Sequence, residues 1–400
     1  MTHRRSEAGM TLIEMMIAVL ISMILSVAVM IVMSTFEGRR RTLGSASDLD
    51  QAGNLAMYQM DRWIRSAGSG LGQSSGYSYG CELFASKASA QLLPIPASPL
   101  LPAPFSSVTG IVRLAPVMIL PNQNTPAVSG STSDMLVVMS TGNDASQMPT
   151  LSTAPATAAQ LTVLNTTEFS PRDLVLIGDQ QPDATTGGPA SCMVSQIAST
   201  LPANGVGKAL PLAGTYYAAT VGARSVASYT QNSVALDLGG DGSSTATSAA
   251  PQFQLIGVGD NNTLFTYDLL QTTTPVQAQA QAEGVFEMHA LYGVDSTGST
   301  NNIVDQWVSP STSAYTVSAL TDGSPTAALL LKRIRAVHVA LILRTSLPEK
   351  APVGPTSLTY FNNVQGVTPV SRPLAGLPST EQYYRYRVVE TTIPVRNNNY

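Results

Sequence analysis

The stretch that decides the fold is residues 10–33, which read MTLIEMMIAVLISMILSVAVMIVM. The run carries one charge, at Glu14, and contains no proline or glycine that would interrupt a helix. At 1.5 Å per residue, a helix of this length measures about 36 Å, which exceeds the ~30 Å hydrocarbon core of a membrane. We therefore predict a transmembrane helix over residues 10–33.

The charges that flank this run bear on its orientation. Arg4 and Arg5 precede it, and basic residues ahead of an apolar run hold that end in the cytoplasm. This predicts a single membrane pass with the rest of the chain outside the cytoplasm. Arg39, Arg40 and Arg41 beyond the run oppose the rule, so charge alone leaves the orientation open.

Two ordinary interpretations of the run are unsatisfactory. A cleaved secretory signal has an apolar core of only ~7–15 residues, and this run is longer. A plain membrane anchor fits the length but leaves Glu14 unexplained. A carboxylate at the centre of a membrane helix costs about 2.5–3.5 kcal/mol on insertion scales, and somewhat less near the end. The run itself offers no cation to compensate it.

A third interpretation rests on residues 9–14, GMTLIE, which resemble the cleavage motif of type IV prepilins. The resemblance implies a leader peptide over residues 1–9, which a prepilin peptidase removes by cutting between Gly9 and Met10. It further implies methylation of the new terminal amine on Met10. Glu14 would then pair with the terminal amine of a neighbouring subunit during filament assembly. Met10 stands where the family usually has Phe, a departure that cleavage should tolerate because the glycine is the more demanding position.

Residues 45–67 continue as an amphipathic helix. Gly68 follows and is typical of a helix end. Apolar residues recur at i, i+3 and i+4 spacing, at Leu49, Ala52, Ala56, Met60, Trp63, Ile64 and Ala67. We predict one long helix over residues 10–68, with a transmembrane half and an amphipathic half that packs on the head.

The remainder, residues 69–400, is predicted to be a β-rich head, so that the fold class is α+β. Short β-branched runs between turn signals predict strands, at Met135–Met139, Leu174–Ile177, Val234–Leu238, Phe253–Val258, Thr263–Leu269, Gly284–Leu291, Ile334–Leu343 and Tyr384–Val389. The run Ile334–Leu343 is the longest and is expected to be central. His338 within it, and His289, are expected to be satisfied strand side chains and not ligands.

Three segments of the head look different. Residues 90–130, 140–160 and 200–250 are rich in Ala, Pro, Ser, Thr and Gly. Such compositions are typical of long surface loops or insertions. We expect these segments to contribute little core.

Beyond the leader, several segments resemble PilW-type minor pilins of the type IV pilin superfamily. These segments are spread over most of the chain. They are Asn54–Gly68, Asp173–Asp179 followed by Cys192-Met193-Val194, Gly284–Gly293, Val337–Arg344 and Tyr384–Asn397. The resemblance implies a pilin-like head.

Cys81 and Cys192 are the only cysteines. A head outside the cytoplasm lies in an oxidising compartment, which favours a disulfide between them. The alternative is two buried free thiols.

Two acidic, glycine-containing stretches were weighed as calcium loops. One holds Asp237 and Asp241, and the other holds Asp295, Asn301 and Asp305. Calcium loops commonly supply three or more carboxylates at alternating positions. Since Ser and Thr occupy the other positions here, we expect a plain hairpin turn and no cofactor, with calcium as the alternative.

Composition and motifs exclude other classes of function. Charged residues make up 12% of the chain and the net charge is −4, so the basic surface that grips nucleic acid is missing. No hydrolase, metalloprotease, P-loop or dinucleotide-binding motif occurs. We expect a protein without enzymatic activity that requires no nucleic acid.

The resemblance implies a minor pilin that primes or caps type IV pilus filaments. Its partners would be the inner membrane, the prepilin peptidase, other minor pilins, the major pilin and a tip adhesin. It would reside in the inner membrane as a single-pass protein, and in the pilus or at its tip after assembly. The alternatives are a J-type pseudopilin of type II secretion and a membrane-anchored surface binding protein or adhesin.

Overall fold

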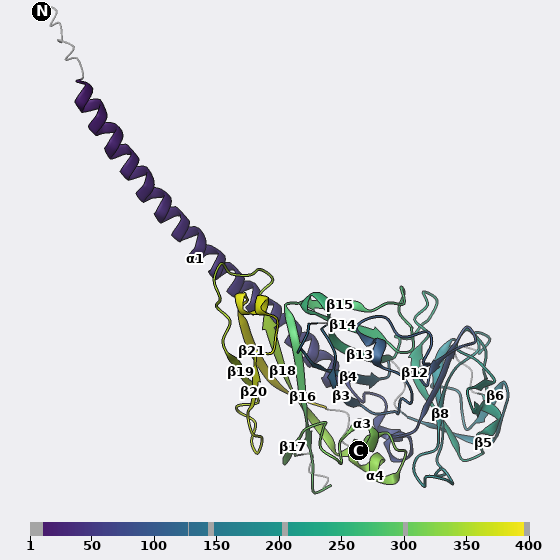
Figure 1. Ribbon diagram of the computed structural model, residues 1–400. Coiled ribbons are helices and arrows are strands. Elements are labelled where there is room, and N and C mark those ends of the chain that lie inside the picture. Colours follow the sequence, from purple (N-terminus) through teal and green to yellow (C-terminus); the bar gives the residue numbers. More distant parts are fainter. Residues whose placement is uncertain (1–10, 127, 143–147, 202–206, 299–302, 396–400) are drawn as a thin grey trace, which may run out of the picture. The chain divides into compact units, whose positions relative to one another are not determined.

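A computed structural model describes residues 11–126, 128–142, 148–201, 207–298 and 303–395. The chain forms two compact units, one that ends at Gln51 and one that begins at Ala52. The long helix α1 (Leu12–Ser66) supplies the first unit and enters the second. The head is rich in sheet (Figure 1). The predicted α+β class is confirmed.

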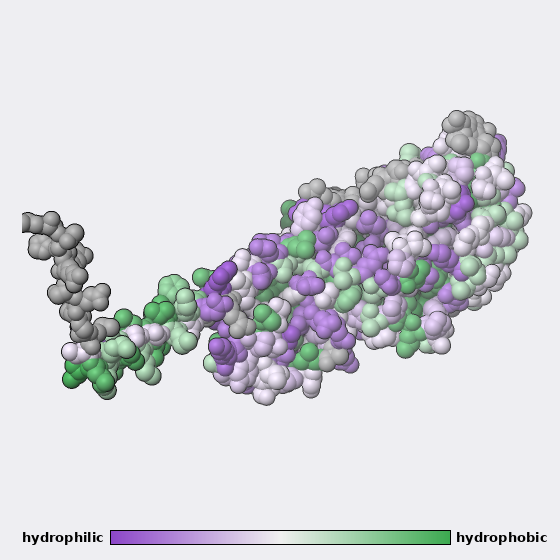
Figure 2. All heavy atoms as spheres, turned by 90° about the horizontal axis from the view of Figure 1, so that it is seen from above, coloured by the Kyte–Doolittle hydropathy of each residue, from purple (hydrophilic) through white to green (hydrophobic). Residues whose placement is uncertain are grey.

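The first part of α1 is apolar on every side. Residues Leu12–Glu37 have a mean hydropathy of 2.9, and none of their most apolar stretch is buried within the chain. Apolar side chains cover this segment in Figure 2. The hydroxyls of Ser22, Ser26 and Thr35 donate to carbonyls three or four residues earlier, which satisfies these donors without water. By length and composition the segment is able to cross a membrane.

The last part of α1 belongs to the head. Ala56, Met60 and Ile64 are fully buried there, at the spacing that one apolar helix face requires. Gly53 lies against the side chains of Leu343 and Val389. Beyond the helix, Gly68 has a φ of +76° and its N–H donates to the carbonyl of Met139. The predicted helix stop is therefore present as a glycine end.

A four-stranded antiparallel sheet receives this helix face. Its order is β17 (Gln306–Val308), β16 (Val285–Val294), β18 (Ile334–Arg344) and β21 (Tyr386–Pro394). The strand predicted to be the longest and central is β18, with eleven residues. The hairpin of β19 (Ser357–Tyr360) and β20 (Val370–Pro373) packs its aromatic side chains on the other face, over Leu291, Ala340 and Ile342.

A second sheet lies against the first. Its order is β15 (Gln279–Glu283), β14 (Thr263–Asp268), β13 (Gln252–Gly259), β4 (Ser133–Ser140) and β3 (Val117–Gln123). The backbone N–H of Ile119 donates to the hydroxyl of Tyr292 at 2.6 Å. The N–H of Ala290 donates to the carboxylate of Asp134 at 2.9 Å. Each sheet thus has a side chain that accepts a hydrogen bond from a backbone N–H group of the other sheet.

The third sheet has eight strands. Its order is β2 (Ala90–Leu93), β1 (Leu83–Lys87), β8 (Cys192–Gln196), β7 (Asp173–Asp179), β12 (Ser233–Gly240), β5 (Thr150–Thr157), β6 (Gln160–Val163) and β9 (Ala209–Pro211). The shorter elements are α2 (Ser75–Ser78), α3 (Val317–Leu320), α4 (Pro325–Arg333), β10 (Thr220–Val221), β11 (Arg224–Ser225), and single 3-10 turns at Gly72–Ser74, Phe105–Ser107, Val226–Ser228, Asp260–Asn262 and Ser379–Tyr383.

The expectation that residues 90–130, 140–160 and 200–250 form loops with little core is wrong. They contain β2, β3, β5 and β9 to β12. Leu210, Val226 and Tyr229 from these segments belong to a buried apolar cluster. The strand β5 reads TLSTAPAT and alternates buried with exposed residues. Because its inward side chains are small or hydroxylated, hydrophobicity gave no strand signal.

One ion pair of the head has a carboxylate that is completely buried. Arg372 on β20 contacts Glu287 on β16 at 2.7 Å, and no part of the Glu287 side chain is exposed. Burial by itself raises the pKa of Glu287, but hydrogen bonds from His289 and Arg372 outweigh it and leave the pKa lowered. The pair therefore stabilises the fold above the unfolded-state pKa, and this contribution is lost in acid.

Removing the Arg372 guanidinium should destabilise the head, because the buried Glu287 carboxylate loses its cation. Arg372→Ala removes the guanidinium from the buried Glu287 carboxylate and leaves it the contact with His289, so we expect the free energy of unfolding of the detergent-solubilised full chain to fall by about 3 kcal/mol. The matched control is Arg385→Ala, whose partner Glu349 is partly exposed, and which should cost less than about 1 kcal/mol. Equal losses in denaturant titrations of the two variants would contradict this account.

Candidate functional site

The predicted processing positions, Gly9 and Met10, lie outside the described residues. Glu14 lies in the first turn of α1. Its N–H donates to the carbonyl of Thr11 at 3.1 Å and approaches the Thr11 hydroxyl at 3.4 Å. Thr11 thereby caps the helix. The sequence analysis missed this role, although Thr-x-x-Glu is the pattern of a capping box.

The surroundings of Glu14 are apolar and open. Leu12 and Ile13 before it, and Ile17 one turn later, are each more than half exposed. Within the described part of the chain, the Glu14 carboxylate makes no ion pair. A carboxylate that enters an apolar environment requires a cation. This segment can therefore receive a positive group from another molecule.

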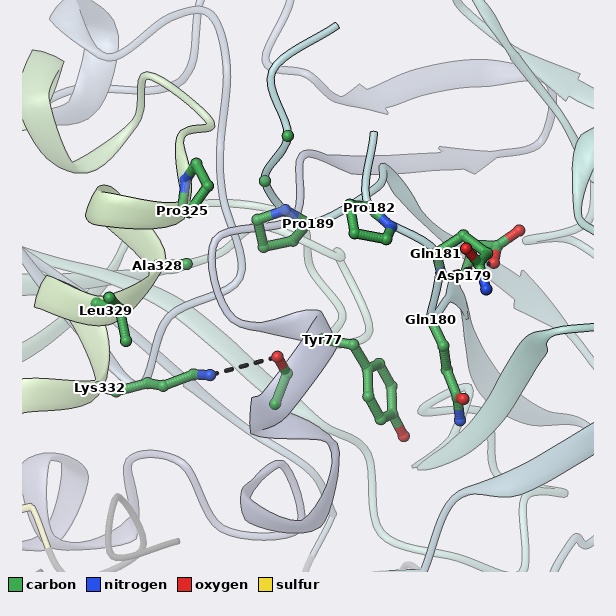
Figure 3. Close-up of a pocket in the computed structure, with 13 residues that line it drawn as sticks. Tyr77, Asp179, Gln180, Gln181, Pro182, Pro189, Pro325, Ala328, Leu329 and Lys332 are labelled. Atoms are coloured by element: carbon green, nitrogen blue, oxygen red, sulfur yellow. Dashed lines mark hydrogen bonds between the residues drawn. The ribbon is translucent and has the colours of Figure 1, made fainter. Parts of the chain in front are cut away.

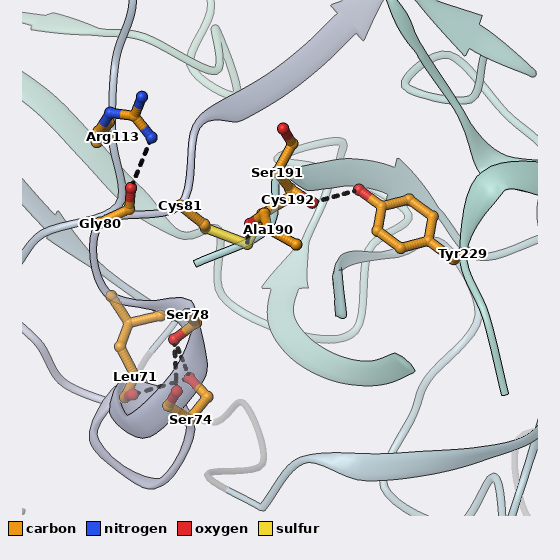
Figure 4. The surroundings of a disulfide bond; sticks show 10 residues. All are labelled: Leu71, Ser74, Ser78, Gly80, Cys81, Arg113, Ala190, Ser191, Cys192 and Tyr229. Atoms are coloured by element: carbon orange, nitrogen blue, oxygen red, sulfur yellow. Dashed lines mark hydrogen bonds between the residues drawn. A yellow bond between two sulfur atoms is a disulfide. The ribbon is translucent and has the colours of Figure 1, made fainter. Parts of the chain in front are cut away.

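Cys81 and Cys192 are joined by a disulfide (Figure 4), with their Cα atoms 5.7 Å apart. Both cysteines are buried. The N–H of Cys192 also donates to the carbonyl of Glu82 at 2.8 Å, and β1 and β8 run parallel from this point. The bridge ties the segment that follows the long helix to the interior of the eight-stranded sheet.

The stretch with Asp295 and Asp305 forms a turn, whereas Asp237 of the other stretch lies within the strand β12. Asp295 is fully buried and accepts the N–H groups of Thr297 and Gly298 at 3.1 and 2.9 Å. Asp305 accepts the N–H and the hydroxyl of Ser296. Asn301 lies outside the described residues. In the described ranges, no group of three or more His, Cys, Asp or Glu side chains is placed to hold a metal.

The other acidic stretch is also held by local bonds. Asp237 accepts the N–H of Gly239 at 2.9 Å. Asp241 pairs with Arg172 and accepts the amide of Gln196. The expectation of no cofactor, with calcium as the alternative, stays a prediction for both stretches.

The two strand histidines make local contacts, as expected of satisfied side chains. His338 contacts Thr392 at 2.8 Å and Glu390 at 3.1 Å. His289 contacts Glu287 and stacks on Tyr360 with the rings 4.7 Å apart. Both lie beneath the β19–β20 hairpin, where they help to hold it.

A pocket of about 290 Å³ opens between α2, α4 and the loop after β7 (Figure 3). Three prolines and Leu329 make one side of it apolar. Two of its charged groups have partners: Lys332 donates to the carbonyl of Gly76, and Asp179 accepts the N–H of Gln181 and the hydroxyl of Thr230. The buried hydroxyl of Tyr77 has no hydrogen-bond partner among the described residues. Burial raises the pKa of Tyr77 to about 12, so its hydroxyl stays protonated. The pocket holds no nucleophile paired with a base.

Comparisons with known families identify both ends of the chain. Residues 4–30 match the prokaryotic N-terminal methylation motif. Residues 254–397, which include the whole four-stranded sheet, match the type IV pilus-assembly protein W family, PilW. Searches of curated proteins and of solved structures gave no match.

The methylation motif on an exposed apolar helix, followed by a β-rich head, defines the class of type IV pilin-like proteins. Within this class, the match of residues 254–397 with the PilW family of type IV pilus assembly proteins, together with the methylation motif, supports a PilW-type protein. PilW is a family of structural assembly proteins. The segment between the matches, residues 31–253, contains all eight strands of the largest sheet.

The disulfide provides a testable prediction. Cys81 and Cys192 are 111 residues apart, and closing a loop of that length stabilises by up to about 4.7 kcal/mol in the chain-entropy model. We expect a reductant to lower the unfolding temperature of the full chain, as followed by circular dichroism. A double variant, Cys81→Ser with Cys192→Ser, should not respond to reductant. Two free thiols in non-reducing peptide mapping would rule out the bridge.

Proposed function

We propose that this chain is a prepilin that is cut between Gly9 and Met10, methylated on Met10 and built into a type IV pilus as a minor pilin. The observation that carries the proposal is the Glu14 carboxylate, which lies on an apolar helix without an ion pair in the described residues. The amine created by cleavage is a cation of the kind it requires, because an α-amino group is largely protonated near neutral pH.

The apolar helix accounts for storage and assembly. Before assembly it holds the subunit in the inner membrane as a single pass, with the head outside. During assembly the Glu14 carboxylate of one subunit meets the Met10 amine of its neighbour. Two buried charges compensate each other only at good geometry, so the pair sets the register between the helices.

The size of the head supports a place at the filament end. Helices that pack side by side lie about 8–10 Å apart. The eight-stranded sheet alone spans roughly 34 Å, at ~4.8 Å per strand. Heads of this width would crowd one another at every helix of a tightly packed bundle unless neighbouring subunits are staggered along its axis. We infer a subunit that primes or caps the filament.

The partners follow from this role. They are the prepilin peptidase, the major pilin, other minor pilins and a tip adhesin that the head would carry. We infer assembly without catalysis, because the matched family is one of structural pilus assembly proteins and the pocket holds no nucleophile paired with a base. The match with PilW favours the pilus over the type II secretion apparatus.

The charge at Glu14 can be tested directly. Glu14→Ala should leave membrane insertion intact, because it removes a polar group from the apolar helix. It leaves the neighbour's amine unpaired, and a loss of about 3 kcal/mol would lower incorporation into sheared filaments roughly a hundredfold. Glu37→Ala is the matched control, since Glu37 is also exposed on α1. Normal incorporation of the Glu14 variant, measured by immunoblot, would refute the register role.

The cleavage site is tested separately. Gly9→Val should block the peptidase, so that the uncut precursor accumulates in the membrane and runs more slowly on a gel. In the unmodified chain, the intact mass should correspond to residues 10–400 with one added methyl group. A mature protein that begins at any residue other than Met10 would contradict the assignment.

A further inference from the structure

The two edges of the four-stranded sheet differ. On the β16 side, β17 pairs with Tyr292, Gly293 and Val294. Beyond β17, the N–H of Met288 donates to the hydroxyl of Ser133 and the N–H of Ala290 donates to Asp134, both at 2.9 Å. This edge is closed by a strand and by side chains of β4.

The exposed edges of the other sheets are closed or short. On β3, the N–H of Ile119 is taken by Tyr292. The edge strands β2 and β9 have four and three residues. A bulge interrupts the pairing of β15 with β14. Proteins use such devices to prevent unwanted strand pairing.

The remaining edge, β21, carries none of these devices. It has nine residues and pairs with β18 without a bulge (Figure 1). The hydrogen bonds Thr345 N–H to Arg385 and Val395 N–H to Arg335 show that odd-numbered residues face β18. The N–H and C=O groups of Tyr386, Val388, Glu390 and Thr392 therefore point outward. Among the described residues, these outward groups have no hydrogen-bond partner.

The composition of β21 suits pairing with a further strand. The segment from Tyr386 to Ile393 contains five β-branched residues and no proline. Every residue before Ile393 is at least partly exposed. A long, flat edge of this kind is a template for an added strand. We propose that β21 receives an extended strand from a different subunit of the same filament.

The size of the contact argues for a tethered partner. A single added strand buries far less than the roughly 1,000 Å² that a stable free complex requires, so a second copy in solution would bind weakly. Subunits anchored in one membrane meet at a high effective concentration, which makes weak pairing effective. The identity of the partner thus rests on the proposed function, whereas the open edge does not. The partner segment should be extended, free of proline and rich in β-branched residues.

Amide exchange tests the edge in the unaltered chain. In detergent, the outward N–H groups of Val388, Glu390 and Thr392 should exchange at least about tenfold faster than the inward N–H groups of Val389 and Thr391. In filament tips, the outward groups should slow by about tenfold or more. Outward groups that stay fast in assembled material would overturn the proposal.

Cross-linking identifies the occupant. A photoreactive residue at the exposed position Arg387 should capture another pilin in filaments, and the same residue at Leu164, also exposed, should not. Capture of a second copy of this chain, or equal capture from both positions, would overturn the assignment. If the proposed function is wrong, the chain will be absent from sheared pili. If only the strand-pairing proposal is wrong, the chain will be present in sheared pili, but position 387 will not cross-link to another pilin.

A pair of variants at Val388 separates the contribution of its backbone N–H to strand pairing from that of its side chain. Val388→Pro removes one outward N–H, and Val388→Ala keeps it. We expect the proline variant to lower cross-linking from position 387 at least about fivefold and the alanine variant to leave it within about twofold. Unchanged thermal unfolding of both full chains shows that the head is intact. If the proline variant unfolds, the exchange experiment still decides.

Discussion

The carboxylate of Glu14 sets the constraint on which the rest of this molecule depends. It lies among exposed apolar side chains of α1, and within the described residues no cation meets it. A membrane or a bundle of helices removes water from this segment, and the charge is then costly unless an ammonium group is supplied. The chain supplies the acidic half of an ion pair, and we propose that a neighbouring subunit supplies the basic half.

The head follows the opposite rule, because it satisfies its own charges. Glu287 meets Arg372 at 2.7 Å, and Glu381 meets Arg344 at the same distance. Asp134 is buried, yet its two oxygens accept backbone N–H groups of Asn122 and Ala290. These carboxylates therefore need no outside partner. The association that we propose involves the helix and the long strand edge of β21, which the described residues leave open.

The sequence predicted the elements whose signals are local. The apolar run gave the helix, and β-branched runs gave β4, β13 and β18. It did not predict β5, because TLSTAPAT packs small and hydroxylated side chains inward. Nor could it predict that Arg372 meets Glu287, which lies 85 positions away, because such a contact depends on the β19–β20 hairpin folding over the sheet. The Thr-x-x-Glu pattern of Thr11 and Glu14 would have predicted that Thr11 caps the start of the helix.

The family match covers the four-stranded sheet and part of the five-stranded sheet, and it leaves the eight-stranded sheet outside. Residues 254–397 hold the four-stranded sheet, whose faces pack on the end of α1 and on the β19–β20 hairpin, and which ends in the open strand β21. The eight-stranded sheet lies outside the match and has its own apolar cluster. Because that cluster is separate, side chains on its surface can change without disturbing the packing beneath β21. The surface of the eight-stranded sheet and the edge of β21 can therefore vary independently within one chain.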